Sequence, residues 1–299
     1  MSARPATLDQ GPGGSAPRRK QGLARLRHAG KQLLILLPLG VLVVWTVLPV
    51  LVTISISFKS PPAVYAQPQL IPVEPTVQAY RDIIGSDGFQ ASFLNSLIIG
   101  IGTALLTLVL SVPAAYAFAR YRFRGRAFLL LFALLPRLIP GLGLIVPLYR
   151  IAVAIGAMDN RLMLVIVFTG TLLPLSVWLL VGFFQQIPRE LEEAANVDGT
   201  NMFDRIRYVV LPLSVPALIT IGVLAFRQAW QEFDLVLALT RSSAARTLPY
   251  ELFLMQDSVG FANNPGLAAF AVLTLVPFIF VYLRLERYVV GGITSGAIK

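Results

Sequence analysis

The charged residue best placed to bind a polar solute is Arg137, which lies within the apolar segment 127–151. It follows Ala127 by ten residues, about 15 Å along a helix and close to the middle of a bilayer. A charge at that depth is costly, so Arg137 is a candidate for function. Its guanidinium carries five N–H donors in a planar fork, which suits a carboxylate or a phosphate. Pairing with a charge on another chain, or reaching toward the membrane surface, is the alternative role.

A second polar group lies in the apolar segment 213–239. Arg227, Gln231 and Asp234 are spaced i, i+4 and i+7, which predicts that they share one face of a helix. An aromatic ring with polar neighbours suits the binding of a sugar ring, although tryptophan is also common at membrane interfaces. The group therefore predicts either a substrate path or a site of helix packing and gating. Its members are Arg227, Trp230, Gln231, Glu232 and Asp234.

The remaining side chains offer no catalytic chemistry. The chain has no cysteine and its one histidine is His28, which excludes disulfides, thiol nucleophiles and Cys-rich or His-rich metal sites. A phosphate-binding loop G-x-x-x-x-G-K-[ST] is also absent, because Gly30-Lys31 lacks the upstream glycine and is followed by Gln32. We therefore expect a protein that is not an enzyme and has no cofactor or metal of its own.

The composition indicates that most of the surface faces lipid. Hydrophobic residues make up 56% of the 299 residues and charged residues only 13%, with a mean hydropathy of +0.72. Soluble domains average about 45–50% apolar and about 25% charged residues. The net charge of +10 would suggest a nucleic-acid partner in a soluble protein, but here the basic residues lie between long apolar runs. We expect an all-α membrane protein and no nucleic-acid partner.

Six apolar segments reach or approach the roughly 20 residues that a helix needs to cross a bilayer. We therefore predict six transmembrane helices in one membrane-spanning domain over residues 32–299. Residues 1–31 are predicted to be a basic, disordered cytoplasmic tail, with a short helix on anionic lipid as the alternative. The first segment is too long for the apolar core of a signal peptide, about 7–15 residues. The segments are residues 32–58, 92–119, 127–151, 162–183, 213–239 and 267–285.

The positions of Lys and Arg predict the orientation. With six spans, seventeen of these residues fall in the inner segments and six in the outer ones. Because positive residues accumulate on the cytoplasmic side, both termini are expected there. Prolines inside the segments are typical of a bundle that bends and moves. Pro136 and Pro140 flank Arg137, so we expect the helix to be broken at that point.

Residues 184–212 form the longest polar stretch between the segments on the inner side. Pro188 can begin a helix, in which Leu191, Ala194 and Ala195 make a small apolar stripe at spacing i, i+3, i+4. Small side chains permit the close approach of another protein. An ordinary interfacial helix is the alternative.

The second half of this stretch predicts a sharp turn and another helix. Gly199, after Asp198, suits a left-handed position at the end of the first helix. Thr200 or Asn201 can cap a second helix, which is expected to bend near Leu211-Pro212 into the next apolar segment.

The spacing in this stretch resembles the EAA loop of importer-type ABC transporter permeases. The pattern of that family is E-A-A-x2-D-G-x9-I-x-L-P, and this chain departs from it only by Val209 in place of isoleucine. The C-terminal RYVVGGITSGAIK resembles the smaller permease of carbohydrate importers of the maltose-permease type, with weaker similarity at Asn95-Ser96 and in residues 230–233. The resemblance covers residues 92–299. The matching loop residues are Glu193, Ala194, Ala195, Asp198, Gly199, Leu211 and Pro212.

The resemblance implies the partners and the activity. A permease of that family has no ATPase activity and works with a second, homologous permease, two ATP-binding cassette subunits that bind the ATP, and an extracytoplasmic solute-binding protein. It lies in the plasma membrane of a bacterium or archaeon. Glu193 would be the polar anchor on the ATPase subunit, Ala194 and Ala195 the contact face, and Asp198-Gly199 the turn that sets the helix angle. A sugar or sugar derivative would then cross by alternating access.

Two other readings stay open. An arginine at position 137 departs from the small or apolar residue usual in that family, which suggests an importer for a phosphorylated or otherwise anionic solute. A secondary transporter that works without ATP would also have buried charges and prolines. It would not require the spacing from Glu193 to Pro212, and six spans without a detectable repeat are unusual for such folds.

Overall fold

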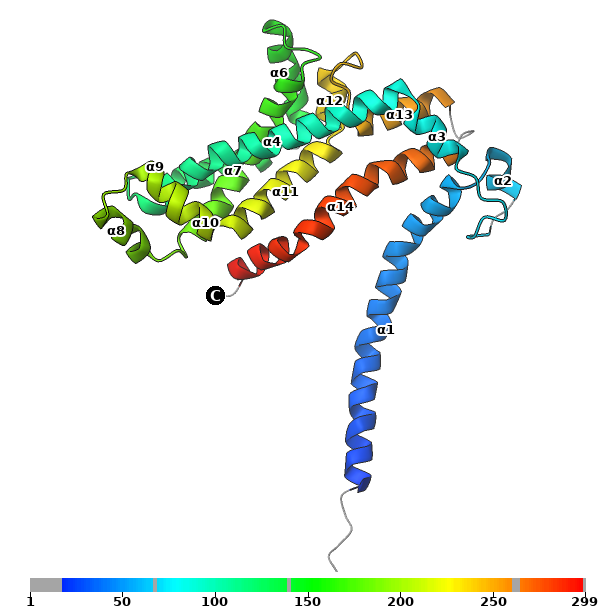
Figure 1. The fold of residues 1–299 in the computed structure, drawn as a ribbon, viewed down its shortest axis with the longest axis horizontal. Helices are drawn as coiled ribbons and strands as arrows, with labels where there is room; N and C mark the ends of the chain where they lie inside the picture. Colours follow the sequence, from blue (N-terminus) through cyan, green and yellow to red (C-terminus); the bar gives the residue numbers. More distant parts are fainter. Residues whose placement is uncertain (1–17, 67–68, 139–140, 260–263, 298–299) are drawn as a thin grey trace, which may run out of the picture. The chain divides into compact units, whose positions relative to one another are not determined.

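Helices and helical turns are the only regular elements in the part of the chain that the structure describes (Figure 1). The structure is a computed structural model, and the residues it describes are 18–66, 69–138, 141–259 and 264–297. The all-α fold predicted from the sequence is confirmed for these residues. The chain divides into two units, residues 1–52 and 53–299, and each is described by itself.

The first unit contains most of α1 (Arg18–Ser57), a single helix of 40 residues. Its part Leu36–Ser57 has a mean hydropathy of 2.5 and is long enough to cross a bilayer. Since α1 begins at Arg18, its backbone includes residues 18–31, which the sequence assigned to the tail. Residues 1–17 lie outside the described part of the chain. The role of this region as a tail stays a prediction.

The second unit is built around four long helices, α4, α7, α11 and α14. Shorter helices and two non-α turns connect them. The turns are the 3₁₀ turn Leu135–Leu138 and the π-helical turn Ile206–Val210. The helices are α2 (Pro61–Ala66), α3 (Gln78–Ile84), α4 (Asp87–Arg120), α5 (Arg126–Leu134), α6 (Gly141–Ala154), α7 (Arg161–Phe184), α8 (Arg189–Val197), α9 (Met202–Arg205), α10 (Leu211–Leu213), α11 (Val215–Gln231), α12 (Asp234–Leu239), α13 (Leu248–Val259) and α14 (Asn264–Ala297).

Four helices among the described residues are long and apolar enough to cross a membrane. A fifth span forms if the bent pair Met202–Leu213 and Val215–Gln231 is taken together, with 83° between the two parts. The predicted count of six is therefore reached only in part and stays a prediction. The four are Leu36–Ser57, Asp87–Arg120, Arg161–Phe184 and Pro265–Leu285.

The third predicted segment, 127–151, is not one continuous helix. Its α-helical hydrogen bonding stops after α5, and Leu135–Leu138 form a 3₁₀ turn before α6 begins at Gly141. Pro136 lies in this turn and has no N–H to donate, which is a physical reason for the interruption. The break expected around Arg137 is confirmed, whereas the continuous span is corrected to two helices.

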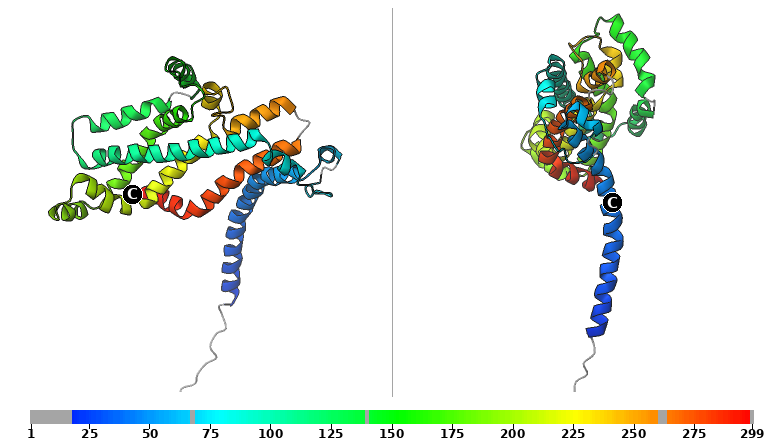
Figure 2. Two further views of the ribbon diagram at one scale, coloured as in Figure 1. Left: turned by 45° about the horizontal axis from the view of Figure 1, so that its top comes forward. Right: turned by 90° about the vertical axis from the view of Figure 1, so that its right-hand side faces the viewer.

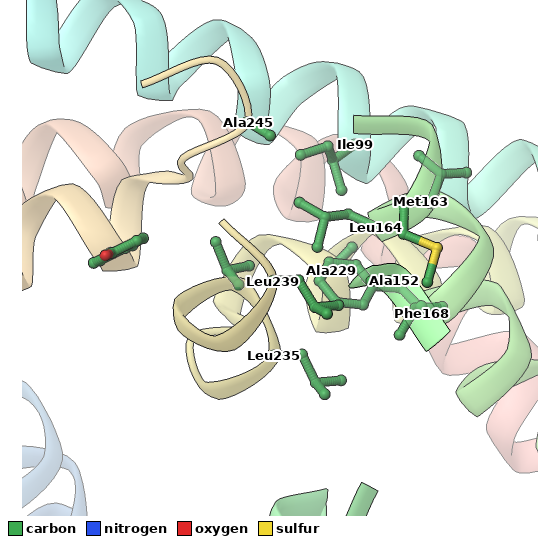
Figure 3. Packing of buried hydrophobic residues seen from close by; sticks show 13 residues of the cluster. Ile99, Ala152, Met163, Leu164, Phe168, Ala229, Leu235, Leu239 and Ala245 are labelled. Atoms are coloured by element: carbon green, nitrogen blue, oxygen red, sulfur yellow. The ribbon is translucent and has the colours of Figure 1, made fainter. Parts of the chain in front are cut away.

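Glycines and small polar residues let α4 approach its neighbours closely. A Cβ on Gly100 would lie 2.8 Å from the ring of Phe226 on α11, and a Cβ on Gly102 would lie 3.0 Å from a methyl group of Val165 on α7. The buried face of α4 also carries Asn95, Ser and Thr residues, a composition typical of helices packed inside a membrane. Figure 3 shows the neighbouring apolar cluster, in which Leu164, Ala229 and Leu235 come from three different helices.

The loop 240–247 between α12 and α13 is held by side chains of distant elements. The amide of Asn95 on α4 donates to the carbonyl oxygens of Ser243 and Arg246, at 3.0 and 2.9 Å. The carboxylate of Asp159 accepts the backbone N–H groups of Arg241 and Ser242, at 2.6 and 2.8 Å. The loop is therefore fixed to α4 and to the segment that connects α6 with α7.

Candidate functional site

The turn predicted in the polar stretch is present. α8 covers Arg189–Val197, and Gly199 has φ +81°, the left-handed conformation expected of it. The side chain of Thr200 closes the turn by donating to the carbonyl of Ala195 at 2.6 Å. Asn201 caps α9, since its side-chain oxygen accepts the backbone N–H of Asp204 at 3.0 Å. α8 and α9 lie at the end of the unit where α4 ends, with α12 and α13 toward the other end (Figures 1 and 2).

The apolar stripe of α8 faces away from the rest of the chain. Val197 is 88% exposed and Leu191 is 46% exposed, while Ala194 is exposed and Ala195 is partly buried. Glu193 is exposed as well. Within the described part of the chain, most of the apolar side of this amphipathic helix is therefore open, and only Ala195 is partly covered.

The inward side of α8 carries a carboxylate that sequence reasoning missed. Glu192 is the only residue of α8 that is buried. Its Oε1 accepts from Nε of Arg120 at 2.6 Å, and its Oε2 accepts from the hydroxyl of Tyr116 at 2.8 Å. The Nη2 group of Arg120 forms an ion pair with Glu192 and also donates to the carbonyl of Ile187 at 3.2 Å. The local sequence provides no signal for this burial, because helical spacing lets all three glutamates of α8 lie on one exposed side.

The second helix leads into α11 through a bend. After the π-helical turn Ile206–Val210, the chain passes Leu211 and Pro212 and changes direction by 83° at Ser214. Leu211 is partly buried and Pro212 is exposed. The bend expected near these two residues is confirmed, two residues beyond the proline.

A cleft of about 700 Å³ brings together residues from both polar groups singled out above. Arg137 lines it from the turn after α5, and Glu232 and Asp234 line it from the junction of α11 and α12. Gln228 adds an amide that the sequence analysis did not single out. The other walls are mainly apolar residues of α6 and α7, among them Leu144, Leu148, Ile151, Ile166 and Pro174.

The predicted helical face in segment 213–239 is wrong. α11 ends at Gln231, and Glu232 has an extended backbone, so Asp234 begins a new helix instead of continuing the face of Arg227. A carboxylate oxygen of Glu232 accepts the backbone N–H of Leu235 at 3.2 Å, which satisfies one of the free N–H groups in the first turn of α12 and stabilises the start of the new helix.

Three other candidates lie outside the cleft. Arg227 and Gln231 are exposed and do not line it. Trp230 is 3% exposed, its ring stacked on Phe226 and edge-on to Phe93. Of the alternatives that the sequence left open for Trp230, this packing favours a structural role.

This arrangement of long helices with a short amphipathic helix at one end also occurs in a solved structure. A chain of a bacterial ABC transporter involved in the import of the acidic polysaccharide alginate shares it, with a TM-score of 0.75 over 92% of this chain and 99% of that chain, at 22% sequence identity. That likeness is one of fold.

Sequence comparison then gives the family. Residues 107–295 match the family described as binding-protein-dependent transport system inner membrane component, and the chain belongs to it. It is 38% identical to the trehalose transport system permease protein SugB of Mycobacterium tuberculosis, over 85% of this chain and 93% of that protein. It is 30% identical to the trehalose/maltose transport system permease protein MalG of Thermococcus litoralis, over 90% and 97% of the two chains. The resemblance to carbohydrate-importer permeases is confirmed.

Proposed function

We propose that this chain is the permease subunit of an ATP-driven importer that moves a sugar or sugar derivative into the cytoplasm by alternating access. The observation that carries the proposal is the geometry of α8, a short helix with an exposed apolar side that ends in the left-handed turn at Gly199. Relatives named for trehalose and maltose transport support the sugar. We also propose that the chain crosses the membrane six times and that both of its termini lie in the cytoplasm.

The face of α8 is the proposed docking site for an ATP-binding cassette subunit. Glu193 would be the polar anchor, Ala194 and Ala195 would allow close approach, and Asp198-Gly199 would fix the angle of the helix. Leu211 and Pro212 would carry its motion toward α11 through the bend. A two-state transporter needs ligands that favour one state over the other, and ATP on the cassette subunits and the loaded binding protein would supply this difference. The remaining partner is a second, homologous permease.

The cleft beside Arg137 is the proposed path of the cargo. One guanidinium, one amide and the carboxyl groups of Glu232 and Asp234 line it, together with apolar walls. Hydroxyl groups both donate and accept, so a neutral sugar can satisfy this mixture, whereas two carboxylates would repel an anion. The cleft thus favours a neutral cargo over the anionic one. Trp230, Arg227 and Gln231 would contribute through helix packing and gating.

The test is transport by the complete complex. The chain, its second permease and its cassette subunits are reconstituted in proteoliposomes with the binding protein, and uptake of radiolabelled trehalose and maltose is measured with ATP and with a non-hydrolysable analogue. Uptake that needs hydrolysis and the binding protein is expected. Uptake that follows an ion gradient without ATP would show a secondary transporter instead.

A further inference from the structure

Glu192 is the side chain of α8 that joins this helix to the end of α4. Among the nine residues of α8, only Glu192 is buried. A separate contact joins α8 to α9, where Nη1 of Arg205 donates to the side-chain oxygen of Asn196 at 2.6 Å. The side chains of Glu192 and Arg120 are 10% and 9% exposed in their ion pair. Two further hydrogen bonds lie beside it, from Tyr116 to Glu192 and from Arg120 to the carbonyl of Ile187.

Such a pair resists separation. A buried carboxylate that loses its cation is left as an uncompensated charge, which is far more costly than the loss of an exposed ion pair. Tyr116 and Arg120 lie one helical turn apart at the end of α4, so they grip the same carboxylate from one rigid element. A displacement of α8 must therefore move the end of α4, or break the pair.

The helix on the other side of this contact, α4, is long and packed against several other helices. α4 has 34 residues, about 51 Å at 1.5 Å per residue, and packs along α7 and α11. Near its start, Asn95 holds the loop 240–247 by two hydrogen bonds. A displacement of Arg120 therefore moves α4, which packs against α7 and α11 and, near its other end, contacts the loop 240–247.

We propose that Glu192, through Arg120 and Tyr116, is the positioning residue that transmits the motion of α8 to α4. The route bypasses the links that join α8 to α7 and α9 along the sequence. The inference rests on the proposed function, because it names the contact through which the docking helix α8 would move the membrane-spanning helices.

The experiment compares Glu192→Gln with Glu190→Gln in the reconstituted complex. Both changes remove one charge from the same helix, but Glu190 is exposed, so it is the matched control. Cargo transported per ATP hydrolysed is measured, together with the amount and melting temperature of the assembled complex. We expect Glu192→Gln to lower the ratio about tenfold, and also to lower the melting temperature because Arg120 loses its counter-charge, with Glu190→Gln near wild type in both.

Further variants separate transmission from a merely structural role. Arg120→Gln should lower the ratio as Glu192→Gln does, and the double variant should be no worse than either, because the two groups act as a unit. Tyr116→Phe keeps the ion pair and should give a smaller fall. Additive effects, or a normal ratio in Glu192→Gln with only less assembled complex, would overturn the inference. A wild-type complex that moves no sugar with ATP would instead overturn the proposed function.

Discussion

Asp159 and Ser242 are 83 residues apart, yet a carboxylate oxygen of Asp159 accepts the backbone N–H of Ser242 at 2.8 Å. The same oxygen accepts the N–H of Arg241, and the N–H of Asp159 donates to the carbonyl of Leu239 at 3.1 Å. Asp159 has φ +56°, a conformation that a non-glycine residue rarely adopts. The segment between α6 and α7 is thus locked to the loop after α12 by a single residue.

This contact predicts a loss of stability in acid. Burial by itself raises the pKa of Asp159, but the hydrogen bonds from Ser242 and Arg241 outweigh it and hold the pKa below its ordinary value of 3.8. A lowered native pKa contributes stability above the ordinary value, and this contribution disappears as the pH falls through the native pKa. The melting temperature of Asp159→Asn should therefore be lower than that of wild type at neutral pH, with the difference shrinking below about pH 4. Glu74→Gln, at an exposed carboxyl, is the control, and equal melting temperatures at neutral pH would contradict the prediction.

Gly199 is predicted to tolerate no side chain. Its φ of +81° costs an L-residue about 1–2 kcal/mol, and the strain falls on the turn that ends α8. Gly199→Ala should lower ATP-driven uptake, and Gly199→Pro should abolish it while the protein still inserts, because proline fixes φ near −65°. Gly182→Ala is the control, since that position is helical and a Cβ would meet nothing within 4 Å. Normal uptake by Gly199→Pro would show that α8 does not couple to the ATPase.

Orientation can be tested because the chain contains no cysteine. Single cysteines at Ser15, Gln69 and Ser295 are treated with a membrane-impermeant maleimide in intact and in permeabilised cells. With six spans and cytoplasmic termini, Gln69→Cys should react in intact cells, and the other two only after permeabilisation. Reaction of Ser295→Cys from outside would exclude an even number of spans with an N-terminus inside.

The local sequence was sufficient to predict those features that depend only on residues close together in the chain. The conformation of Gly199 and the cap at Asn201 follow from residues within a few positions, and long apolar runs require helices in lipid. The choice between Glu192 and Glu193 could not be made in this way, because both carboxylates have the same local sequence. The difference between them is the rotation of α8 about its axis, and this is set by Arg120 and Tyr116, more than seventy residues earlier in the chain.

The same limit explains the misplaced helical face in segment 213–239. The spacing of Arg227, Gln231 and Asp234 is helical, and periodicity alone continues α11 through all three. The helix ends at Gln231, where Glu232 has an extended backbone and its carboxylate accepts the N–H of Leu235 in α12. The new helix is held in place by the apolar cluster that includes Leu235 and Leu239. Arg137, Glu232 and Asp234 of the cleft could be predicted from the sequence, whereas Gln228 and the helix break that brings Asp234 into the cleft could not.

The last prediction concerns Arg137 and the nature of the cargo. If Arg137 binds the cargo through its planar fork, Arg137→Lys keeps the charge but loses the paired donors, so uptake per inserted molecule should fall. If the arginine only balances Glu232 and Asp234, lysine should be tolerated, and Arg137→Ala should mainly reduce the amount of folded protein. Arg150→Ala, at an exposed arginine of α6 outside the cleft, is the control.

A variant at Asp234, a carboxyl residue of the same cleft, tests whether the cargo is neutral or anionic. Asp234→Asn removes a negative charge and keeps the size of the side chain, so uptake of an anionic sugar should rise relative to a neutral one if Asp234 excludes anions. Uptake of labelled trehalose and of an alginate oligosaccharide is measured for wild type, Asp234→Asn and Arg137→Lys, in each case with substrate-stimulated ATP hydrolysis. A wild-type complex that prefers the acidic oligosaccharide, and loses that preference in Arg137→Lys, would contradict the neutral cargo and restore the anionic one. Unchanged selectivity in both variants would show that the cleft is not on the path.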